Sequence, residues 1–326
     1  MKSKIIQLLK SADDYISGEE MSKIFGVSRT AIWKVITHLK GQGYIIESVT
    51  NKGYYLKSSP DLLTEEEIIY DLKTRYIGKK VYHYDKIDST NKEAKKLASK
   101  GEKEGIVVVA EEQLLGKGRL GRTWSSPTGV GIWMSIILRP EISPIDASKV
   151  TLIAGLAVCR GIESVTGLKS QIKWPNDIII NNKKVCGILT EMSAEIEKIN
   201  YIILGIGMNV NTYSFPEDIM NKATSLKIEG KKNYDRKDIL QQILVEFEKN
   251  YDDFIKNNNM DKVLREYKRN CLTLGKDVKI IERAGEFTGK ALDVSKEGEL
   301  IVQKENGEMV TVLSGEVSVR GMYGYI

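Results

Sequence analysis

A loop rich in glycine and basic residues is the segment of this chain best suited to bind an anion. Residues 116–122 read Gly-Lys-Gly-Arg-Leu-Gly-Arg, and Lys117, Arg119 and Arg122 supply the positive charge. Guanidinium groups form paired contacts with phosphate and carboxylate oxygens, and glycine lets the backbone approach a ligand closely. We therefore expect an anionic ligand here. The alternative is a mobile surface loop without a ligand.

Two nucleotide-binding motifs nearly match this loop, and both are excluded. Its three glycines fit the G-x-G-x-x-G pattern of dinucleotide-binding folds, and residues 116–123 resemble a P-loop with Arg122 in place of the lysine. Both motifs require a helix directly after the loop, because the helix N-terminus holds the phosphates. Here a turn-rich run follows, and then a strand predicted for residues 132–138. Neither a Rossmann fold nor a P-loop is expected.

Two further segments combine a lysine with turn or strand residues. Residues 173–177 read Lys-Trp-Pro-Asn-Asp, a composition that taken alone more often forms a structural corner than a site. Residues 183–189 lead from Lys184 into an apolar strand with a glycine that allows close backbone approach. A lone exposed lysine is usually solvated surface, so neither segment by itself identifies a site.

The reactive residues of the chain give little support to covalent catalysis or a metal site. The only histidines are His38 and His83, and no Ser–His or Cys–His arrangement is indicated. Cys159, Cys186 and Cys271 are too far apart for a Cys-x-x-Cys site, and three cysteines do not make a disulfide framework. They fit a reducing cytosol.

The first 57 residues predict a winged helix-turn-helix that binds DNA. Nine Lys and Arg against five acids place +4 of the chain's net +5 there, which suits a polyanionic partner. Ser17 and Glu20 form a capping box, Gly26 ends that helix, and Ser28 caps a second helix. The turn at 50–53 joins two short apolar runs as a wing. The candidate DNA contacts are Ser28, Arg29, Thr30, Trp33, Lys34 and Thr37. The alternative is a small helical cap that only packs on the next domain.

The rest of the chain divides into a mixed α/β region and a β region. Residues 58–60 are expected to be a linker, after which Thr64 begins a capping box. Strands are predicted at 81–87, 106–111, 131–138, 184–192 and 201–210, with helices at 90–99 (a Thr90/Glu93 capping box), 147–165 and 235–257. This order favours a largely mixed sheet. From about 274, four short β runs (277–282, 287–295, 300–304 and 309–320) predict a small barrel.

Composition bounds the class of protein. The 326 residues are 41% hydrophobic and 29% charged, which excludes a disordered chain and allows two or three domains. The longest apolar stretch, 201–210, is half of what a membrane span needs, and the N-terminus lacks the pattern of a secretory signal. We expect a soluble cytoplasmic protein with no membrane partner.

Taken in order, these segments resemble the biotin–protein ligase family. The resemblance rests on Asp-Ser-Thr-Asn at 88–91, Gln113, the loop at 116–122, the segments at 173–177 and 183–189, and Gly-Ile-Gly-Met-Asn-Val-Asn at 205–211. With the winged helix, the chain is similar to the bifunctional form, a ligase that also represses the biotin operon. The similarity extends over nearly the whole chain.

The resemblance implies an activity, partners and a fold. The family activates biotin with ATP and Mg²⁺ to biotinyl-5′-AMP, and transfers biotin to a lysine of biotin carboxyl carrier protein. The adenylate-bound form is expected to be a homodimer that binds operator DNA. The implied fold is α+β and multidomain. It comprises a winged helix-turn-helix at 1–60, a ligase domain like class II synthetases at 61–273 and an SH3-like barrel at 274–326.

The resemblance also implies residue roles. Lys184 and Arg119 would be catalytic, acting on the biotin carboxylate and the α-phosphate. The biotin set would be Ser89, Thr90, Asn91, Gln113, Lys117, Gly118, Arg119 and Lys184. The nucleotide set would be Arg122, Trp124 and Asn176, and no Mg²⁺ ligand is assigned. Many family members have arginine where this chain has Lys117, so a point charge replaces a planar fork there.

Two other functions remain open at this stage. One is a DNA-binding regulator whose second domain only senses a small carboxylic acid, although the presence of Arg119 and Lys184 argues against it. The other is a lipoate-type ligase, which shares the reaction and differs in the acid that it activates.

Overall fold

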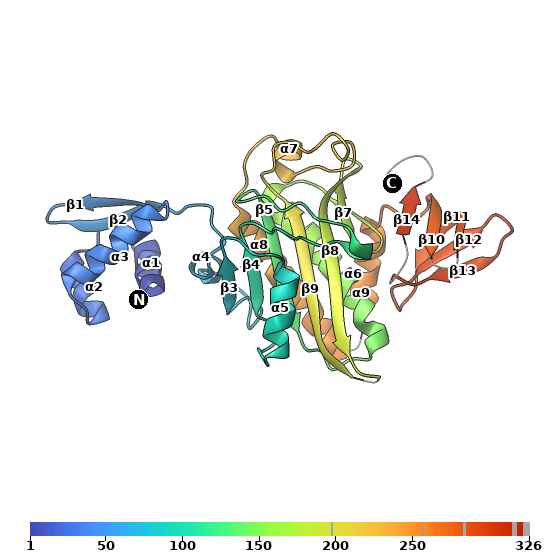
Figure 1. Ribbon diagram of the computed structural model, residues 1–326, viewed down its shortest axis with the longest axis horizontal. Helices are drawn as coiled ribbons and strands as arrows, with labels where there is room; N and C mark the ends of the chain where they lie inside the picture. Colours follow the sequence, from blue (N-terminus) through green and yellow to red (C-terminus); the bar gives the residue numbers. More distant parts are fainter. Residues whose placement is uncertain (197, 258, 283–284, 315–317, 322–326) are drawn as a thin grey trace.

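Three regions follow one another along the chain in this computed structural model (Figure 1). The structure describes residues 1–326 apart from 197, 258, 283–284, 315–317 and 322–326. An N-terminal helical region with a hairpin lies at one end, a seven-stranded sheet with helices forms the middle, and a five-stranded sheet lies at the other end.

The N-terminal region is the predicted helix-turn-helix with a wing. Its elements are α1 (Lys2–Ser11), α2 (Gly18–Phe25), α3 (Arg29–Gly41), β1 (Ile45–Val49) and β2 (Gly53–Ser58). The Ser17 hydroxyl accepts from the Glu20 N–H, Gly26 ends α2 at φ 63°, and the Ser28 hydroxyl accepts from the Ala31 N–H. Both predicted caps are therefore confirmed. β1 and β2 pair antiparallel, and apolar side chains from all three helices form one core beneath them.

The central sheet is mixed, as predicted. In spatial order its strands are β3 (Val81–Tyr84), β4 (Val107–Ala110), β5 (Gly131–Leu138), β9 (Ile199–Asn209), β8 (Lys183–Ala194), β7 (Asp177–Ile180) and β6 (Gln171–Lys173). Only β3 and β4 are parallel; the other neighbours are antiparallel. The short hairpin of β6 and β7, which the sequence suggested only as a corner, extends the sheet edge.

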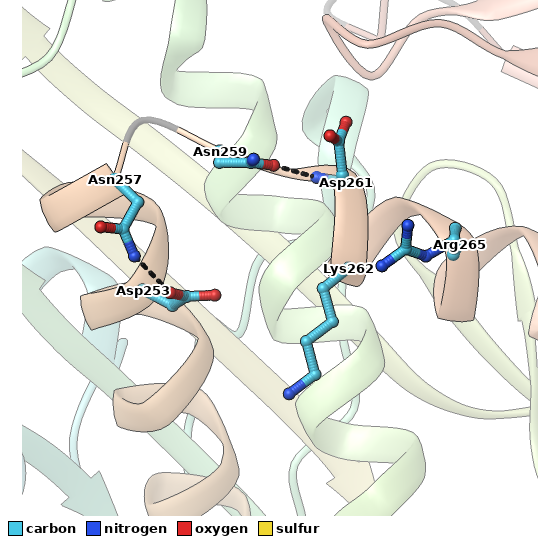
Figure 2. Close-up of a pocket in the computed structure, with 6 residues that line it drawn as sticks. All are labelled: Asp253, Asn257, Asn259, Asp261, Lys262 and Arg265. Atoms are coloured by element: carbon cyan, nitrogen blue, oxygen red, sulfur yellow. Dashed lines mark hydrogen bonds between the residues drawn. The ribbon is translucent and has the colours of Figure 1, made fainter.

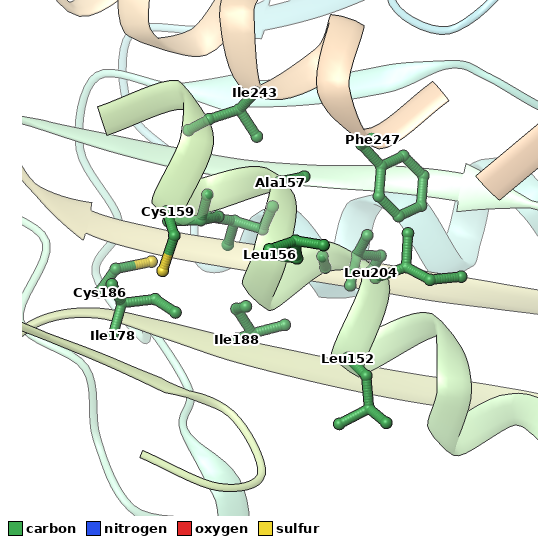
Figure 3. Packing of buried hydrophobic residues seen from close by; sticks show 14 of the residues in the cluster. Leu152, Leu156, Ala157, Cys159, Ile178, Cys186, Ile188, Leu204, Ile243 and Phe247 are labelled. Carbon is green, nitrogen blue, oxygen red and sulfur yellow. The ribbon is translucent and has the colours of Figure 1, made fainter. Parts of the chain in front are cut away.

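Helices cover the two faces of this sheet unequally. On one face α6 (Ala147–Thr166), α8 (Arg236–Asn257) and α9 (Asp261–Asn270) form a continuous apolar core, part of which is drawn in Figure 3. The other face carries the shorter α5 (Thr90–Ser99), packed mainly on β4, β5 and β9. The side of the sheet beyond the start of α5 is therefore available for a ligand. Two short helices, α4 (Glu65–Ile69) and α7 (Leu226–Gly230), lie outside these layers.

No helix in the described part of the chain combines the length and apolar character needed to span a bilayer. All three cysteines are buried and free, so the prediction that they form no disulfide holds. Cys159 and Cys186 belong to the core drawn in Figure 3.

The C-terminal region is an antiparallel sheet in the order β13-β12-β11-β10-β14. Its strands are β10 (Asp277–Glu282), β11 (Gly285–Val294), β12 (Leu300–Lys304), β13 (Met309–Val312) and β14 (Ser318–Gly321). The single strand predicted over 309–320 is wrong. Val312 on β13 and Val319 on β14 are both buried but belong to strands at opposite edges of the sheet, so they cannot share one strand.

A buried carboxylate joins the N-terminal region to the central one. Glu67 on α4 is 1% exposed; it lies 2.5 Å from Lys10 Nζ and accepts from the Tyr44 hydroxyl at 2.7 Å. Burial, together with the charge of Glu67, raises the pKa of Tyr44 far above its usual value, so the phenol stays a donor. The Tyr70 hydroxyl donates to the Lys10 carbonyl as well. The orientation of the winged helix is thus fixed by specific polar contacts.

A second buried charge fixes the linker that follows. Arg236, with no exposed surface, contacts Asp61 Oδ2 at 3.0 Å, Glu111 Oε2 at 2.7 Å and the Gly131 carbonyl at 3.1 Å. Burial alone would raise the pKa of Glu111, but His83, Arg236 and the Leu63 N–H outweigh it and lower that pKa to about 2. The linker, the end of β4 and the start of α8 therefore share one charge cluster.

We predict that Arg236→Met lowers the free energy of unfolding by about 3–5 kcal/mol, because it leaves Asp61 and Glu111 without their buried cation. The folded-state pKa of Glu111 is below its ordinary 4.5. Its stabilising contribution is therefore complete above about pH 4.5 and is lost as the pH falls toward 2. In the variant the folded-state pKa of Glu111 should rise, so the acid-induced loss becomes smaller and the difference in unfolding free energy between the two proteins narrows as the pH falls. Urea unfolding between pH 3 and 7 measures both effects.

Lys237→Met is the matched control, because the neighbouring side chain only reaches the more exposed Asp235 and Asp238 at 3.8 and 3.6 Å. It should cost less than about 1 kcal/mol. An equal cost for the two variants would contradict the assignment of a buried charge cluster.

Candidate active site

The open face of the sheet carries two glycines on which large side chains rest. A Cβ atom on Gly205 would lie 2.2 Å from Asn91 Oδ1, and one on Gly207 would lie 2.6 Å from Trp124 Nε1. These glycines are two residues apart on β9, so they share one face of the sheet. Asn91 and Trp124, which are 33 positions apart in the chain, therefore lie side by side on that face.

A polar pocket forms at the N-terminus of α5. Gln113 Oε1 accepts from the Thr90 N–H at 2.8 Å and from the Thr90 hydroxyl at 3.1 Å. Gln113 Nε2 donates to the Ser126 hydroxyl at 2.8 Å. Ser89 precedes the helix without using its side chain as a cap, and it is 3% exposed. The predicted Thr90/Glu93 capping box is wrong, because Thr90 is the first helical residue and its hydroxyl bonds Gln113.

Beside this pocket a cationic cluster surrounds Asp177. Lys184 Nζ lies 2.6 Å from Asp177 Oδ1. Arg119 donates to Asn176 Oδ1 at 2.9 Å, and Asn176 Nδ2 in turn donates to the Ile188 carbonyl at 2.8 Å. Arg119 and Lys184 thus contact two consecutive residues, Asn176 and Asp177, while their meeting in one pocket as catalytic residues stays a prediction. The Asp177 carboxylate, which the sequence analysis treated only as a turn residue, lies between them.

Two cations of this cluster, Lys173 and Arg119, have lowered pKa values, chiefly because they are buried. Burial lowers the pKa of Lys173 to about 8; Asp177 opposes the shift, while Lys184, Arg320 and Arg122 add to it. Burial also lowers the pKa of Arg119, again with Asp177 opposing. Lys173 lies opposite Asp177 in the β6–β7 hairpin, which explains their proximity. Asp177 therefore offsets part of the repulsion among the cations nearby, an arrangement that favours a polyanionic ligand.

Trp124 joins the two parts of the site. Lys184 Nζ lies 5.1 Å from the centre of its ring, a cation–π contact. The indole Nε1 is buried, and the described part of the chain offers it no acceptor. This N–H edge of the ring lies against Gly207, so the indole is held flat on β9.

The basic loop is a narrow hairpin-like turn. The Gly118 N–H donates to the Arg122 carbonyl at 2.7 Å, and Leu120 adopts φ 55°. Arg119 points inward and also donates to the Ser314 carbonyl of the C-terminal region. Lys117 and Arg122 are exposed on the loop. Arg119 is therefore the predicted loop residue that, within the described part of the chain, side-chain hydrogen bonds fix to other elements.

Some site residues escaped sequence analysis. Lys173 and Asp177 were part of a quoted motif but were assigned no role, because their spacing does not reveal that a hairpin pairs them. Ser135 donates to Asn91 Oδ1 at 2.6 Å. It is the single polar residue inside the apolar strand β5, a signal that could have identified it. Glu191 contacts Asn91 Nδ2 at 2.7 Å and carried no signal of its own.

A separate hollow of about 290 Å³ lies where α8 and α9 meet (Figure 2). Its lining mixes Asp253 and Asp261 with Lys262 and Arg265, and its asparagines bond within the lining. None of the predicted site residues lines it. No group of three or more potential metal-ligating side chains occurs in the ranges that the structure describes.

The proposed DNA-contacting residues form one exposed face of the N-terminal region. Ser28, Arg29, Thr30, Trp33, Lys34 and Thr37 are all exposed, whereas Ile32, Ile36 and Leu39 are buried on the opposite side of α3. Trp33 is 55% exposed although it is a large aromatic residue. α3 is the second helix of the helix-turn-helix. An exposed tryptophan among basic residues on that helix suits contact with a nucleic acid.

Three family matches follow the three regions of the chain. Residues 2–55 match the HTH domain, residues 84–209 match the biotin/lipoate A/B protein ligase family, and residues 273–320 match the biotin protein ligase C terminal domain.

Similar proteins are known over nearly the full length. The chain is 41% identical over 310 residues to the bifunctional ligase/repressor BirA of Bacillus spizizenii, covering 94% of this chain and 95% of that protein. It is 29% identical to BirA of Escherichia coli, covering 97% and 96%. Among solved structures, the biotin protein ligase of Aquifex aeolicus in complex with biotin and ATP is 33% identical. It has a TM-score of 0.66 and covers 74% of this chain and 99% of that chain.

The charge cluster predicts that the protein binds inorganic pyrophosphate in the absence of other ligands. Raising NaCl from 50 to 300 mM should weaken binding, because salt screens the attraction. Lys184→Met should raise Kd about tenfold through loss of a charge-assisted contact. Isothermal titration calorimetry measures both.

The control is Lys183→Met, which removes the same charge one residue earlier, where Nζ contacts the Met220 carbonyl at 3.2 Å. Equal losses in the two variants would mean that pyrophosphate only senses net charge, and the assignment of a site around Asp177 would then be wrong.

Proposed function

The chain belongs to the bifunctional ligase/repressor family, and we propose that it activates biotin with ATP to biotinyl-5′-AMP and transfers biotin to a lysine of biotin carboxyl carrier protein. It also represses biotin genes in response to biotin, through its helix-turn-helix. One observation carries the ligase proposal. A polar pocket and a cationic cluster lie next to each other on one face of the sheet, linked by Trp124 above Gly207.

The residue roles follow from this division. The ureido ring of biotin occupies the polar pocket, formed by Ser89, Thr90, Asn91 and Gln113. The biotin carboxylate lies at Lys184 and Arg119, and the loop with Lys117 and Gly118 closes over it. The nucleotide lies beside Arg122, Trp124 and Asn176. The contact of Lys184 with the Trp124 ring and the cations gathered around Asp177 and Asn176 support these roles.

The first reaction brings two anions together. A carboxylate oxygen of biotin attacks the α-phosphorus of ATP, the bond to the β-phosphate oxygen breaks, and pyrophosphate leaves. Two unit charges 4 Å apart repel by about 4 kcal/mol at an effective dielectric near 20. Lys184 and Arg119 offset this repulsion and hold the reactants in line, so the protein acts by positioning and charge stabilisation.

The second reaction consumes the mixed anhydride. The amine of the carrier lysine attacks the acyl carbon, and AMP leaves with the bonding electron pair. Until the carrier arrives, the anhydride must be kept from water. The loop suits that task because Arg119 fastens it both to Asn176 and to the C-terminal region.

Mg²⁺ accompanies ATP in this proposal. It is usually bound by substrate phosphates and one or two carboxylates, and Asp177 is the carboxylate that the site offers. The ion would neutralise phosphate charge, and Asp177 would exchange its contact with Lys184 for one with the metal.

We propose three domains, at 1–60, 61–273 and 274–326. β2 ends at Ser58 and β10 begins at Asp277, which agrees with these limits. The central domain would resemble class II synthetases, since it has a largely antiparallel sheet with most of its helices packed on one face. The C-terminal five-stranded sheet would be an SH3-like barrel.

For repression, the adenylate-bound protein forms a homodimer that presents two α3 helices to a palindromic operator. The fixed attachment of the winged helix through Glu67 supports this, because a rigid connection transmits the dimer's spacing to the DNA. A regulator without enzyme activity is disfavoured by the Lys184–Asp177–Arg119 arrangement. A lipoate ligase is disfavoured because the dithiolane ring of lipoate offers no N–H or C=O to the polar pocket.

We predict that the protein with biotin, ATP and Mg²⁺ labels the lysine of a carrier fragment, which mass spectrometry detects as one biotinyl addition. Lys184→Ala should lower the rate of adenylate formation at least about 100-fold, because it removes a charge-assisted contact to both reactants. Lys183→Ala should retain the wild-type rate. Labelling with lipoate but not biotin would refute the biotin assignment.

The repressor proposal predicts ligand-dependent DNA binding. DNA selected from a random pool by the wild-type protein with biotin and ATP should contain an inverted repeat, and omitting biotin should weaken binding to it at least about tenfold. Lys34→Ala should weaken DNA binding but leave adenylate formation unchanged. Gel-shift titration tests both. Equal DNA affinity with and without biotin would rule out the coupling.

A further inference from the structure

Asn91 lies flat across three strands of the central sheet. Ser135 on β5, Gly205 on β9 and Leu189 on β8 are paired in one row, and the missing side chain of Gly205 leaves the space that the Asn91 amide fills. Its Oδ1 accepts from the Ser135 hydroxyl at 2.6 Å. Its Nδ2 donates to Glu191 Oε2 at 2.7 Å, with the Leu189 carbonyl at 3.5 Å.

Glu191 determines which way this amide points. An ionised carboxylate can only accept hydrogen bonds, so the NH₂ end of Asn91 has to face β8. Lys95 Nζ, 2.6 Å from Glu191 Oε1, keeps the carboxylate in place. Ser135 cannot fix the orientation, because its hydroxyl can both donate and accept, and its single hydrogen has two candidate acceptors, Asn91 Oδ1 at 2.6 Å and Thr90 Oγ1 at 2.8 Å. Without Glu191 the amide could turn over.

The fixed orientation leaves Asn91 with an unused acceptor. Both hydrogens of Nδ2 face β8, toward Glu191 and Leu189, while Oδ1 retains a second lone pair beyond the one that Ser135 uses. Asn91 is 6% exposed and lies beside Thr90, whose partners complete the polar pocket. A ligand ring entering this pocket therefore meets an acceptor at Asn91 and gains most if it carries an N–H there.

We propose that Glu191 is a positioning residue that makes the pocket specific for a cyclic urea, by fixing Asn91 as an acceptor for one ring N–H. This inference rests on the proposed binding of biotin in that pocket. Glu191 touches no part of the ligand. It acts through Asn91, and a ring that lacks this N–H is rejected because the Asn91 oxygen stays buried without a donor.

The test compares biotin with its two mono-N-methylated ureido isomers. In the wild type, one isomer should bind about 100-fold more weakly than biotin, because methylation removes the N–H that faces Asn91. In Glu191→Leu, the Kd for biotin should rise about tenfold and the discrimination against that isomer should fall about tenfold. The kcat of adenylate formation at saturating biotin should stay unchanged, with the effect confined to KM.

Three further variants isolate the mechanism. Glu191→Gln should lose the discrimination as Glu191→Leu does, because its amide oxygen would face Lys95 and its NH₂ group would face Asn91, which turns the Asn91 amide over. Glu195→Gln removes a charge just beyond the end of β8 and should change nothing. In an Asn91→Ala background, Glu191→Leu should have no additional effect on discrimination, since Glu191 acts through Asn91.

Each outcome decides between the possibilities. If the wild type binds biotin but Glu191→Leu weakens biotin and both isomers in parallel, Glu191 has only a general structural role and the inference fails. Wild-type discrimination in Glu191→Gln, or an undiminished effect in the Asn91→Ala background, also overturns it. If the wild type does not bind biotin at all, the proposed function fails instead.

Discussion

Mutual repulsion among positive charges is the constraint on which this site depends, and Asp177 is the group that makes their proximity tolerable. Lys184 forms an ion pair with it, Arg119 bonds the adjacent Asn176, and Lys173 faces it across a two-stranded hairpin. The hairpin is anchored from outside the sheet: the Trp174 N–H donates to Thr273 Oγ1 and the indole donates to the Gly298 carbonyl. The C-terminal region therefore helps to hold the cations where an anion can use them.

The unequal covering of the central sheet gives this charge a place to act. Long helices seal one face with a continuous apolar core, whereas the other face carries only the short α5. Glycines on β9 let Asn91 and Trp124 lie directly on the backbone of that face. A ligand can thus extend from neutral hydrogen-bonding groups to concentrated positive charge, as required by a molecule with a polar ring at one end and a carboxylate at the other.

Two buried charge clusters tie the DNA-binding region to this site. Glu67 receives Lys10 and Tyr44 from the winged helix, and Arg236 joins the linker at Asp61 to Glu111. Glu111 is two residues from Gln113, which bonds Thr90 in the polar pocket. Because isolated buried charges are costly, these connections favour a definite orientation over free movement on a flexible tether. The winged helix and the ligase region are therefore joined by these two charge clusters in a definite orientation.

Local patterns in the sequence determined the local elements. Capping residues predicted the starts of α2 and α3, apolar periodicity predicted α6 and α8, and β-branched runs predicted β5, β8 and β9 within a few residues. The order of motifs pointed to the family, and in the structure Arg119 and Lys184 contact two consecutive residues, Asn176 and Asp177. The errors also come from reading local patterns, because a local pattern does not show contacts with distant residues. Thr90 has the spacing of a cap, but its hydroxyl bonds a partner 23 positions away.

Only the tertiary structure decided what those motifs do together. In the sequence Asp177 has the character of a turn residue. In the structure the β6–β7 hairpin places Lys173 opposite it, and Lys184 forms an ion pair with it. Nothing in the sequence distinguishes Glu191 from the other acidic residues. Its role depends on the pairing of β8 with β9, which places it beside Asn91. Helix caps and apolar periods depend on neighbours within a few residues, so they can be read along the chain. A binding site depends on pairings between distant strands, and those pairings are set by the packing of the whole sheet.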